Sequence, residues 1–177
     1  MAGVWGKSTS STPEWVVWKH RSLSNKHCEV CLKLDRCWFA KQNTPPWPQH
    51  FLCHCVLEKL SYTDVLTKSS AVCSYSKFDP YLFDVQGEYR HGKGALFESW
   101  GYTVEDSQYL KEEFEKQALQ KYISGDYQLG VLNKHGQRIS IRIEIKNKKN
   151  GGWVSFITGW LVKPNGQITL NTPYGGK

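Results

Sequence analysis

Two closely spaced pairs of cysteines constrain this chain more than any other feature of its sequence. Cys28 and Cys31 form a CxxC pair, Cys53 and Cys55 form a CxC pair, and the loop between the pairs holds three prolines. Four thiolates in two tight pairs can surround one tetrahedral Zn²⁺, because each pair directs two sulfur atoms at a point about 2.3 Å away. The sequence therefore predicts a structural zinc site with these four cysteines as ligands.

Two other uses of cysteine are alternatives to a metal site. The chain has six cysteines, an even number that suits three disulfide bonds, and single cysteines often serve as small buried apolar residues. The first thirty residues hold no apolar run typical of a secretory signal peptide, which favours free thiols. The substitute ligands that we leave out of the predicted site are His27, Cys37, His50, His54 and Cys73.

The positive charge of the chain is concentrated in its last third. Between Val131 and Lys177 there are eight Lys and Arg residues against one acidic residue, and the formal net charge of the whole chain is +7. Such a segment favours a polyanionic partner, with nucleic acid the first candidate. A solvated strand face with cationic turns is the alternative. No apolar run approaches the ~20 residues of a membrane span, so we expect a soluble protein of the cytoplasm or a virion, without a membrane partner.

Composition divides the chain into an arm and two structured parts. Residues 1–14 are small and polar and predict a flexible arm, residues 15–68 contain the cysteine pairs and predict a zinc module, and residues 76–177 carry the stronger helix and strand signals. We expect a boundary near residues 69–76. Helices followed by strands, without βαβ alternation, predict an α+β fold, in which a small zinc module precedes a domain of two to three helices and an antiparallel sheet.

Start and stop signals place the helices of the second part. A residue that caps a helix or opens its first turn marks the start of two of the expected helices, and a glycine follows the longer ones. The signals are Asp79 with Pro80 before a short helix over 81–83, Gly101 after ALFESW, and a capping box of Thr103 and Asp106 for a longer helix that ends near Gly125.

The strands follow the helices. Four isoleucines alternate with polar residues between Gln137 and Ile145, which predicts one buried face and one open face. A three-residue turn containing Gly166 would pair Val162 with Ile168, Trp160 with Leu170 and Thr158 with Thr172. A two-residue turn would shift the register by one, and we favour the three-residue turn.

Residues 15–60 resemble the C-terminal end of the Mu-type phage head morphogenesis, or minor head, family. The resemblance rests on the pattern W...HCEVCLKLD...PPWPQHFLCHC, from Cys-x-x-Cys through Leu-Asp to a stretch that closes in Cys-x-Cys. It implies a zinc clasp derived from a phage protein. Members of that family are often fused at this end to variable toxin-like domains, so the resemblance also implies a different domain after the clasp.

Residues 76–177 are similar to an uncharacterised domain of such fusions and of polymorphic toxins. The matching segments are SKFDPYLF, HGK, WGYT, HGQRISI, TGW and LNTPYGGK. A fainter likeness is to colicin D-like RNase toxins, in which a basic His/Lys cluster works with a hydroxyl-x-Trp pair on a strand. This likeness implies a catalytic set of His91, Lys93, Thr158 and Trp160.

The residue chemistry suits RNA cleavage without a metal. That reaction uses the ribose 2′-OH as nucleophile, so it needs an acid, a base and cations near the phosphorus. His91 can transfer protons near neutral pH and lies beside Lys93 at a Gly-rich helix entrance. Thr158 and Trp160 share a strand face with Phe156, so a core role is their alternative. The expected substrate-binding residues are Arg138, Arg142, Thr172 and Tyr174.

These observations predict a phage-derived, toxin-like protein that acts as a metal-independent RNase on tRNA or another RNA. The alternative is a non-enzymatic phage or prophage accessory that binds nucleic acid or a head component. A third hypothesis, ADP-ribosyl transfer, lacks a suitable glutamate, because Glu144 is the only acidic residue after Asp126. The expected partners are RNA, an acidic immunity protein and a phage head component.

Overall fold

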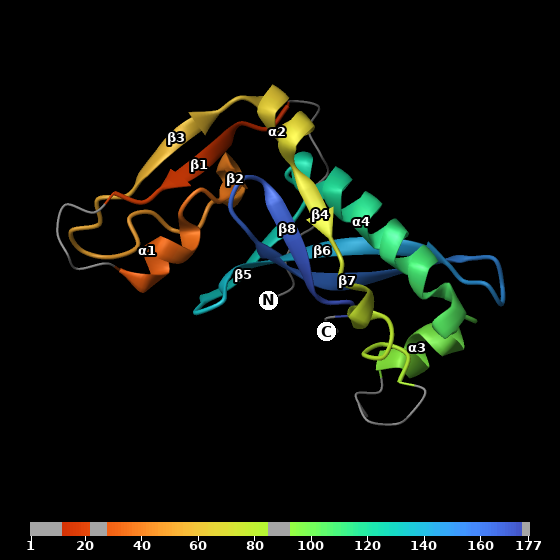
Figure 1. Ribbon diagram of the computed structural model, residues 1–177. Coiled ribbons are helices and arrows are strands. Elements are labelled where there is room, and N and C mark those ends of the chain that lie inside the picture. Colours follow the sequence, from red (N-terminus) through yellow and green to blue (C-terminus); the bar gives the residue numbers. More distant parts are fainter. Residues whose placement is uncertain (1–11, 22–27, 85–92, 175–177) are drawn as a thin grey trace, which may run out of the picture.

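A small antiparallel sheet begins the fold. The computed structural model describes residues 12–21, 28–84 and 93–174. Three strands pair in the order β2-β1-β3, and one helix and one 3₁₀ turn lie in their connections (Figure 1). These elements are β1 (Trp15–Lys19), α1 (Glu29–Leu34), β2 (Trp38–Ala40), the turn η1 (Lys41–Asn43) and β3 (Val56–Leu60).

The segment that we expected to be a domain boundary is part of the larger sheet. Helix α2 (Tyr62–Lys68) leads into β4 (Ser70–Val72), and β4 pairs in parallel with β8 (Gln167–Thr172) at the edge of a five-stranded sheet. The sheet is therefore mixed, whereas the sequence predicted an antiparallel one. A three-residue strand has no period that could reveal a partner almost a hundred residues away, and β4 lies within the segment 69–76 where we expected the boundary.

The expected helices form, with one exception. Helix α3 (Lys93–Ser99) ends before Gly101, and α4 (Ser107–Ile123) ends before Gly125; both glycines have positive φ. The Thr103–Asp106 capping box is present and opens the turn η3 (Val104–Asp106) before α4. The short helix over 81–83 is absent. Instead the turn η2 (Tyr75–Lys77) continues into tight turns, in which the backbone N–H groups of Leu82 and Phe83 both donate to the Phe78 carbonyl.

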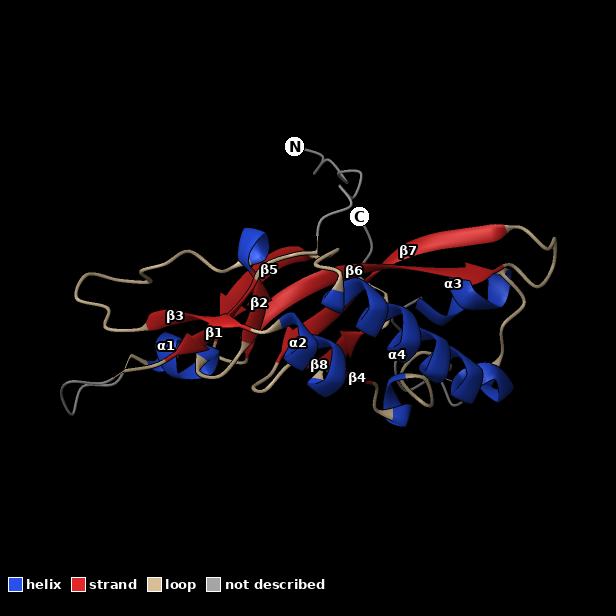
Figure 2. Cartoon of the chain, turned by 90° about the horizontal axis from the view of Figure 1, so that it is seen from above, coloured by secondary structure: helices blue, strands red, loops and turns tan. Residues whose placement is uncertain are grey.

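The five-stranded sheet has one buried and one open face. Its order is β4-β8-β7-β6-β5, with β5 (Gln128–Asn133), β6 (Gly136–Lys146) and β7 (Trp153–Val162) completing it. Helix α4 packs across one face (Figures 1 and 2). The four isoleucines of β6 are buried under it, as their alternation predicted. The chain therefore has the α+β fold expected from its sequence.

The β7–β8 register confirms most of the predicted hairpin. Val162 pairs with Ile168 and Trp160 with Leu170, but a bulge then places Gly159, not Thr158, opposite Thr172. A side chain at position 159 would place its Cβ 2.8 Å from Thr172 Cγ2. Glycine at this position lets the strands stay in contact across the bulge.

The two sheets share one core. The Trp15 and Tyr122 rings meet edge to face with centroids 5.1 Å apart, and a Cβ at Gly166 would lie 2.5 Å from the Trp38 ring. A bridge between Cys37 and Pro164 adds a backbone connection. The buried apolar residues run without a break from β1 to β8. The cysteine-containing first part and the second part of the chain are therefore packed together around a common core.

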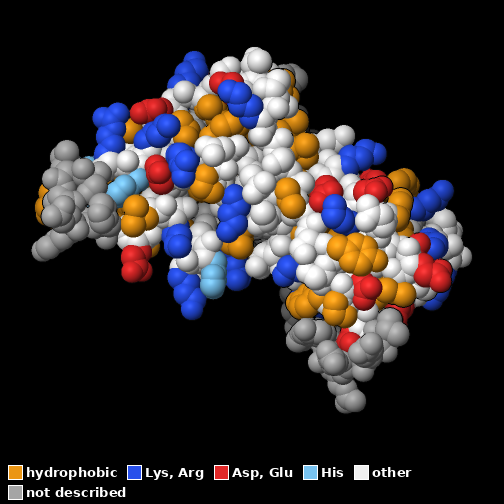
Figure 3. Space-filling view, in the orientation of Figure 1, with side chains coloured by type: hydrophobic (Ala, Val, Ile, Leu, Met, Phe, Trp, Pro, Cys, Tyr) orange, Lys and Arg blue, Asp and Glu red, His pale blue; other side chains and the backbone are white. Residues whose placement is uncertain are grey.

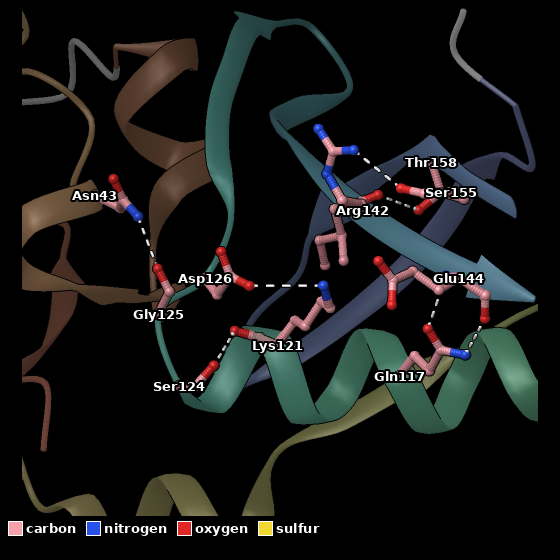
Figure 4. Close-up of polar contacts among 11 residues, drawn as sticks. Asn43, Gln117, Lys121, Ser124, Gly125, Asp126, Arg142, Glu144, Ser155 and Thr158 are labelled. Carbon is pink, nitrogen blue, oxygen red and sulfur yellow. Dashed lines mark hydrogen bonds and ion pairs between the residues drawn. The ribbon is translucent and has the colours of Figure 1, made fainter. Parts of the chain in front are cut away.

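Part of β6 extends beyond its neighbour β5. The last register pair of these strands on this side is Gln128 with Ser140, so the backbone of Glu144 has no β5 partner. The Gln117 side chain of α4 fills this place: its Oε1 accepts the Glu144 N–H at 2.9 Å, and its amide donates to the Glu144 carbonyl at 2.6 Å (Figure 4). A helix side chain thus completes the strand's hydrogen bonds.

Thr158 and Trp160 lie in the centre of the core. Both are fully buried. The Trp160 indole N–H donates to Thr158 Oγ1 at 2.8 Å, and the Thr158 hydroxyl donates to the Ile141 carbonyl at 2.8 Å. Both side-chain polar atoms of this pair, Thr158 Oγ1 and Trp160 Nε1, therefore make hydrogen bonds inside the protein. The structure thus gives both side chains a packing role without access to solvent.

Replacing Thr158 with valine should therefore destabilise the protein. The change keeps the shape of the side chain but leaves the buried Trp160 N–H without an acceptor, which costs about 1–3 kcal/mol. Urea denaturation followed by circular dichroism should show that loss, whereas Thr169→Val on the open face should change the unfolding free energy little. An unfolding midpoint identical to that of the wild type would contradict the packing role.

Candidate functional site

The two cysteine pairs meet in space. Cys28 directly precedes α1 and Cys31 lies within it, while Cys53 and Cys55 lie in the segment that leads into β3. Cys31, Cys53 and Cys55 have their sulfur atoms within 4.8 Å of one another, and Cys28, Cys31 and His50 form a second such group. All six cysteines lie in the described ranges and are free thiols. The four predicted ligands are therefore brought together, without disulfide bonds.

The distances within the cluster suit a tetrahedral ion. Cys31 Sγ lies 3.7 Å from Cys53 Sγ and 3.4 Å from His50 Nε2. Metal–sulfur bonds of about 2.3 Å at tetrahedral angles place two ligand sulfurs about 3.8 Å apart. Cys31 belongs to both groups of donors. The cluster can hold a metal ion, and Cys31 is the donor common to both groups.

The environment of the thiols favours a bound cation. Burial, followed by hydrogen bonds and charge from the neighbouring cysteines, raises the pKa of Cys31 strongly. Burial also raises the pKa of Cys55, and the nearby Trp18 indole opposes this effect. That buried indole N–H has no hydrogen-bond partner in the described part of the chain. A cation would offset the cost of ionising these thiols, and the thiolate of Cys55 would satisfy Trp18.

His50 is a donor that the sequence did not place in the site. Its Nδ1 lies 2.8 Å from the Phe51 carbonyl oxygen, which only accepts, so Nδ1 carries the hydrogen and Nε2 faces Cys31 with a lone pair. The same hydrogen bond is the main cause of the raised pKa of His50. This arrangement is typical of metal-binding histidines. The spacing of three residues between His50 and Cys53 was the available signal.

A second cluster forms around Lys93 at the start of α3. Lys93 Nζ donates to Thr172 Oγ1 at 3.1 Å and to the Tyr81 hydroxyl at 3.3 Å, and it lies 5.6 Å from the centre of the Tyr81 ring. The Thr172 hydroxyl in turn donates to the Tyr174 carbonyl at 3.0 Å. Lys93, Thr172 and Tyr174 were predicted site residues, and the structure brings them together. Tyr81 was not predicted.

The other predicted residues are dispersed. Thr158 and Trp160 are in the core, and Arg138 and Arg142 lie on the open face of the sheet, where Arg142 Nη1 donates to Ser155 Oγ at 2.9 Å (Figure 4). His91 lies outside the described residues. The four-residue catalytic set implied by the toxin likeness is therefore not assembled among its three described members.

Comparison with known proteins identifies a family. A family model described as a domain of unknown function, DUF6883, matches residues 66–176. The match includes β4, Lys93 and Thr172, and it begins after the cysteine cluster. No curated protein and no solved structure matches the chain. Among the described residues, no helix combines the length and apolar character needed to cross a bilayer.

Removing the shared ligand should abolish metal binding. Cys31→Ser takes one donor from both groups, so the purified wild type should contain a bound metal that the Cys31 variant lacks, measured by mass spectrometry of the acid-released metal. Cys73→Ala, a buried thiol outside both groups, should retain it. Equal metal content in the wild type and the Cys31 variant would contradict the site.

The contributions of His50 and its neighbour His54 to metal binding can be distinguished by an affinity measurement. His50→Ala removes a donor that faces Cys31, and we expect metal affinity to fall about 10- to 100-fold in competition with a chromogenic chelator. His54→Ala removes an exposed side chain that lies in neither group, and its metal affinity should match that of the wild type. Identical affinities for the two variants would show that the cysteines alone bind the ion.

Proposed function

The chain belongs to the DUF6883 family, and we propose that it is a phage-derived, toxin-like ribonuclease that cleaves RNA without a catalytic metal. The observation that carries this proposal is the Lys93 ammonium group, held by the hydroxyls of Thr172 and Tyr81. The turns after η2, the start of α3 and the end of β8 meet to fix one cation, and Thr172 lies 79 positions from Lys93. Such a fixed charge is what a phosphoryl-transfer site requires.

Lys93 is suited to stabilise charge on phosphate. An ammonium group has three N–H donors, and two of them point to the hydroxyls of Thr172 and Tyr81 within the described residues. The third can donate to a non-bridging phosphate oxygen. Thr172 is itself fixed by its bond to the Tyr174 carbonyl, so the cation is positioned before the substrate arrives.

The proposed reaction is a transesterification. A base removes the 2′-OH proton, and the 2′ oxygen then attacks the adjacent phosphorus. The bond from phosphorus to the 5′ oxygen breaks while an acid protonates that oxygen, which yields a 2′,3′-cyclic phosphate and a 5′-hydroxyl. Lys93 stabilises the negative charge that grows on the phosphorus oxygens. His91, two residues before Lys93 in the sequence, is the proposed proton-transfer group.

We propose Zn²⁺ as the ion of the cysteine cluster, with a structural role. Thiolates together with an imidazole are the donors that zinc prefers in tetrahedral sites. With protein ligands in all four positions, the ion would have no open place for a substrate, so it would contribute to the folding of residues 44–55, which lead from η1 to β3. Free thiols and an RNA substrate both suit the cytoplasm.

A second candidate function is nucleic-acid binding without cleavage, as in a phage or prophage accessory protein. The burial of Thr158 and Trp160 favours it, because that burial removes two residues from the catalytic set implied by the toxin likeness. The arginines on the open sheet face would then bind the phosphate backbone.

The two functions differ in the effect of Lys93→Gln. If the protein is a ribonuclease, this variant should cleave tRNA and ribosomal RNA about 100-fold more slowly than the wild type, since one cation that stabilises the transition state is lost. The rate would be measured on gels with zinc-loaded protein and no added divalent ion. A repeat in EDTA needs circular dichroism to show that the protein remains folded.

Lys116→Gln is the matched control, because Lys116 is an exposed lysine of α4 that is not among the residues of the Lys93 cluster. It should cleave like the wild type. Equal cleavage rates for the folded Lys93 variant and the wild type would refute the proposed role of Lys93. RNA that is bound and retarded but never cut by the wild type would establish the binding function instead.

A further inference from the structure

The β6–β7 hairpin exposes a large aromatic side chain. Trp153, the first residue of β7, is 73% exposed, which makes it the most exposed tryptophan among those that the structure describes. Tryptophan is normally used in cores or at binding sites, because its indole ring gains much free energy when it leaves water. In this protein Trp15, Trp18 and Trp160 are fully buried. Packing in the core therefore does not explain the presence of a tryptophan at position 153.

Trp153 shares the open face of the sheet with a row of cations. It pairs across the strands with Lys146, and alternation along β6 places Arg142 and Arg138 on the same face. These three basic residues are spaced four apart, so the row spans about 26 Å at about 3.3 Å per residue. Lys149 follows in the turn of the hairpin and is exposed. An aromatic ring thus stands at one end of a basic strip.

The other side of the sheet carries helix α4, in which acidic and basic side chains balance. Helix α4 packs on the isoleucine face and carries Glu112, Glu113 and Glu115 together with Lys111, Lys116 and Lys121, and Figure 3, which views the molecule as in Figure 1, shows red and blue side chains over the region of α3 and α4. On β5 to β8 the only acidic residue is Glu144. The open face is therefore the surface with the clearest preference for a polyanion.

We propose that this open face binds single-stranded RNA, with a base stacked on Trp153 and the backbone phosphates along Lys146, Arg142 and Arg138. The inference rests on the proposed action on RNA and specifies the form of the substrate. A duplex hides the faces of its bases, whereas a single strand can lay one base on the indole. Ser155, on the neighbouring strand, holds the Arg142 guanidinium on this face, where it can meet a phosphate.

The decisive experiment compares single-stranded and duplex RNA. A fluorescein-labelled 12-nucleotide RNA, alone or annealed to its complement, would be titrated with the zinc-loaded protein and followed by fluorescence anisotropy at one salt concentration. Trp153→Ala should weaken binding of the single strand about 10- to 100-fold, as expected for the loss of one stacked base, and should change duplex binding little. Trp153→Phe should restore most of the lost affinity, because it keeps an aromatic face.

Two further variants serve as controls. Leu66→Ala removes another exposed apolar side chain, on α2, and should bind the single strand like the wild type. Glu144→Gln removes the one acidic group of the strip and should tighten binding of both forms. Unchanged single-strand affinity in Trp153→Ala, or an equal loss for the single strand and the duplex, would overturn the stacking platform.

The test of the Trp153 binding surface and the test of the Lys93 cluster can fail independently of each other. Lys93→Gln tests cleavage, and Trp153→Ala tests binding. Weaker single-strand binding in the Trp153 variant supports the platform even if Lys93→Gln cleaves normally. Normal single-strand binding in the Trp153 variant refutes the platform even if Lys93→Gln abolishes cleavage.

Discussion

Tyr122 makes the contacts on which the rest of the molecule depends, because it joins the two sheets. The residue is fully buried near the end of α4, its ring meets Trp15 of β1, and its hydroxyl donates to the Trp38 carbonyl at 2.7 Å. Burial of its hydroxyl raises the pKa of Tyr122 well above its usual range, so it stays a neutral donor. Tyr122 is part of the single apolar core that runs through both sheets and includes Cys31 and Cys55.

Local patterns in the sequence predicted the parts of the fold that depend on near neighbours. The isoleucine alternation in β6, the Thr103–Asp106 capping box and the stop at Gly101 each need only a few adjacent residues, and the structure confirms them. The parallel pairing of β4 with β8 and the bulge at Gly159 depend on distant contacts. No periodicity in the sequence encodes them, which is why a domain boundary was placed inside the sheet.

The residues of the candidate site also divide into those that local sequence patterns predicted and those that only the structure revealed. The four cysteines were found because each pair is local, but His50 was left out because one histidine near a cysteine pair has many uses. The Lys93 contact with Thr172 joins residues that are 79 positions apart; the toxin likeness nominated Lys93, and side-chain chemistry nominated Thr172. Trp153 carried no motif, and Tyr81 appeared only within the matching segment SKFDPYLF, with no role assigned. Their proposed roles rest on a hydrogen bond and on exposure, which only the three-dimensional structure supplies.

The Gln117 contact with the β6 backbone also bears on how copies of this protein behave toward one another. A strand that extends past its neighbour exposes unpaired N–H and C=O groups, and such an edge can recruit a strand from a second molecule. Gln117 occupies both groups of Glu144 at this position. The helix thereby removes the Glu144 N–H and C=O groups from the exposed edge of β6, and a strand of a second molecule has fewer groups to pair with there.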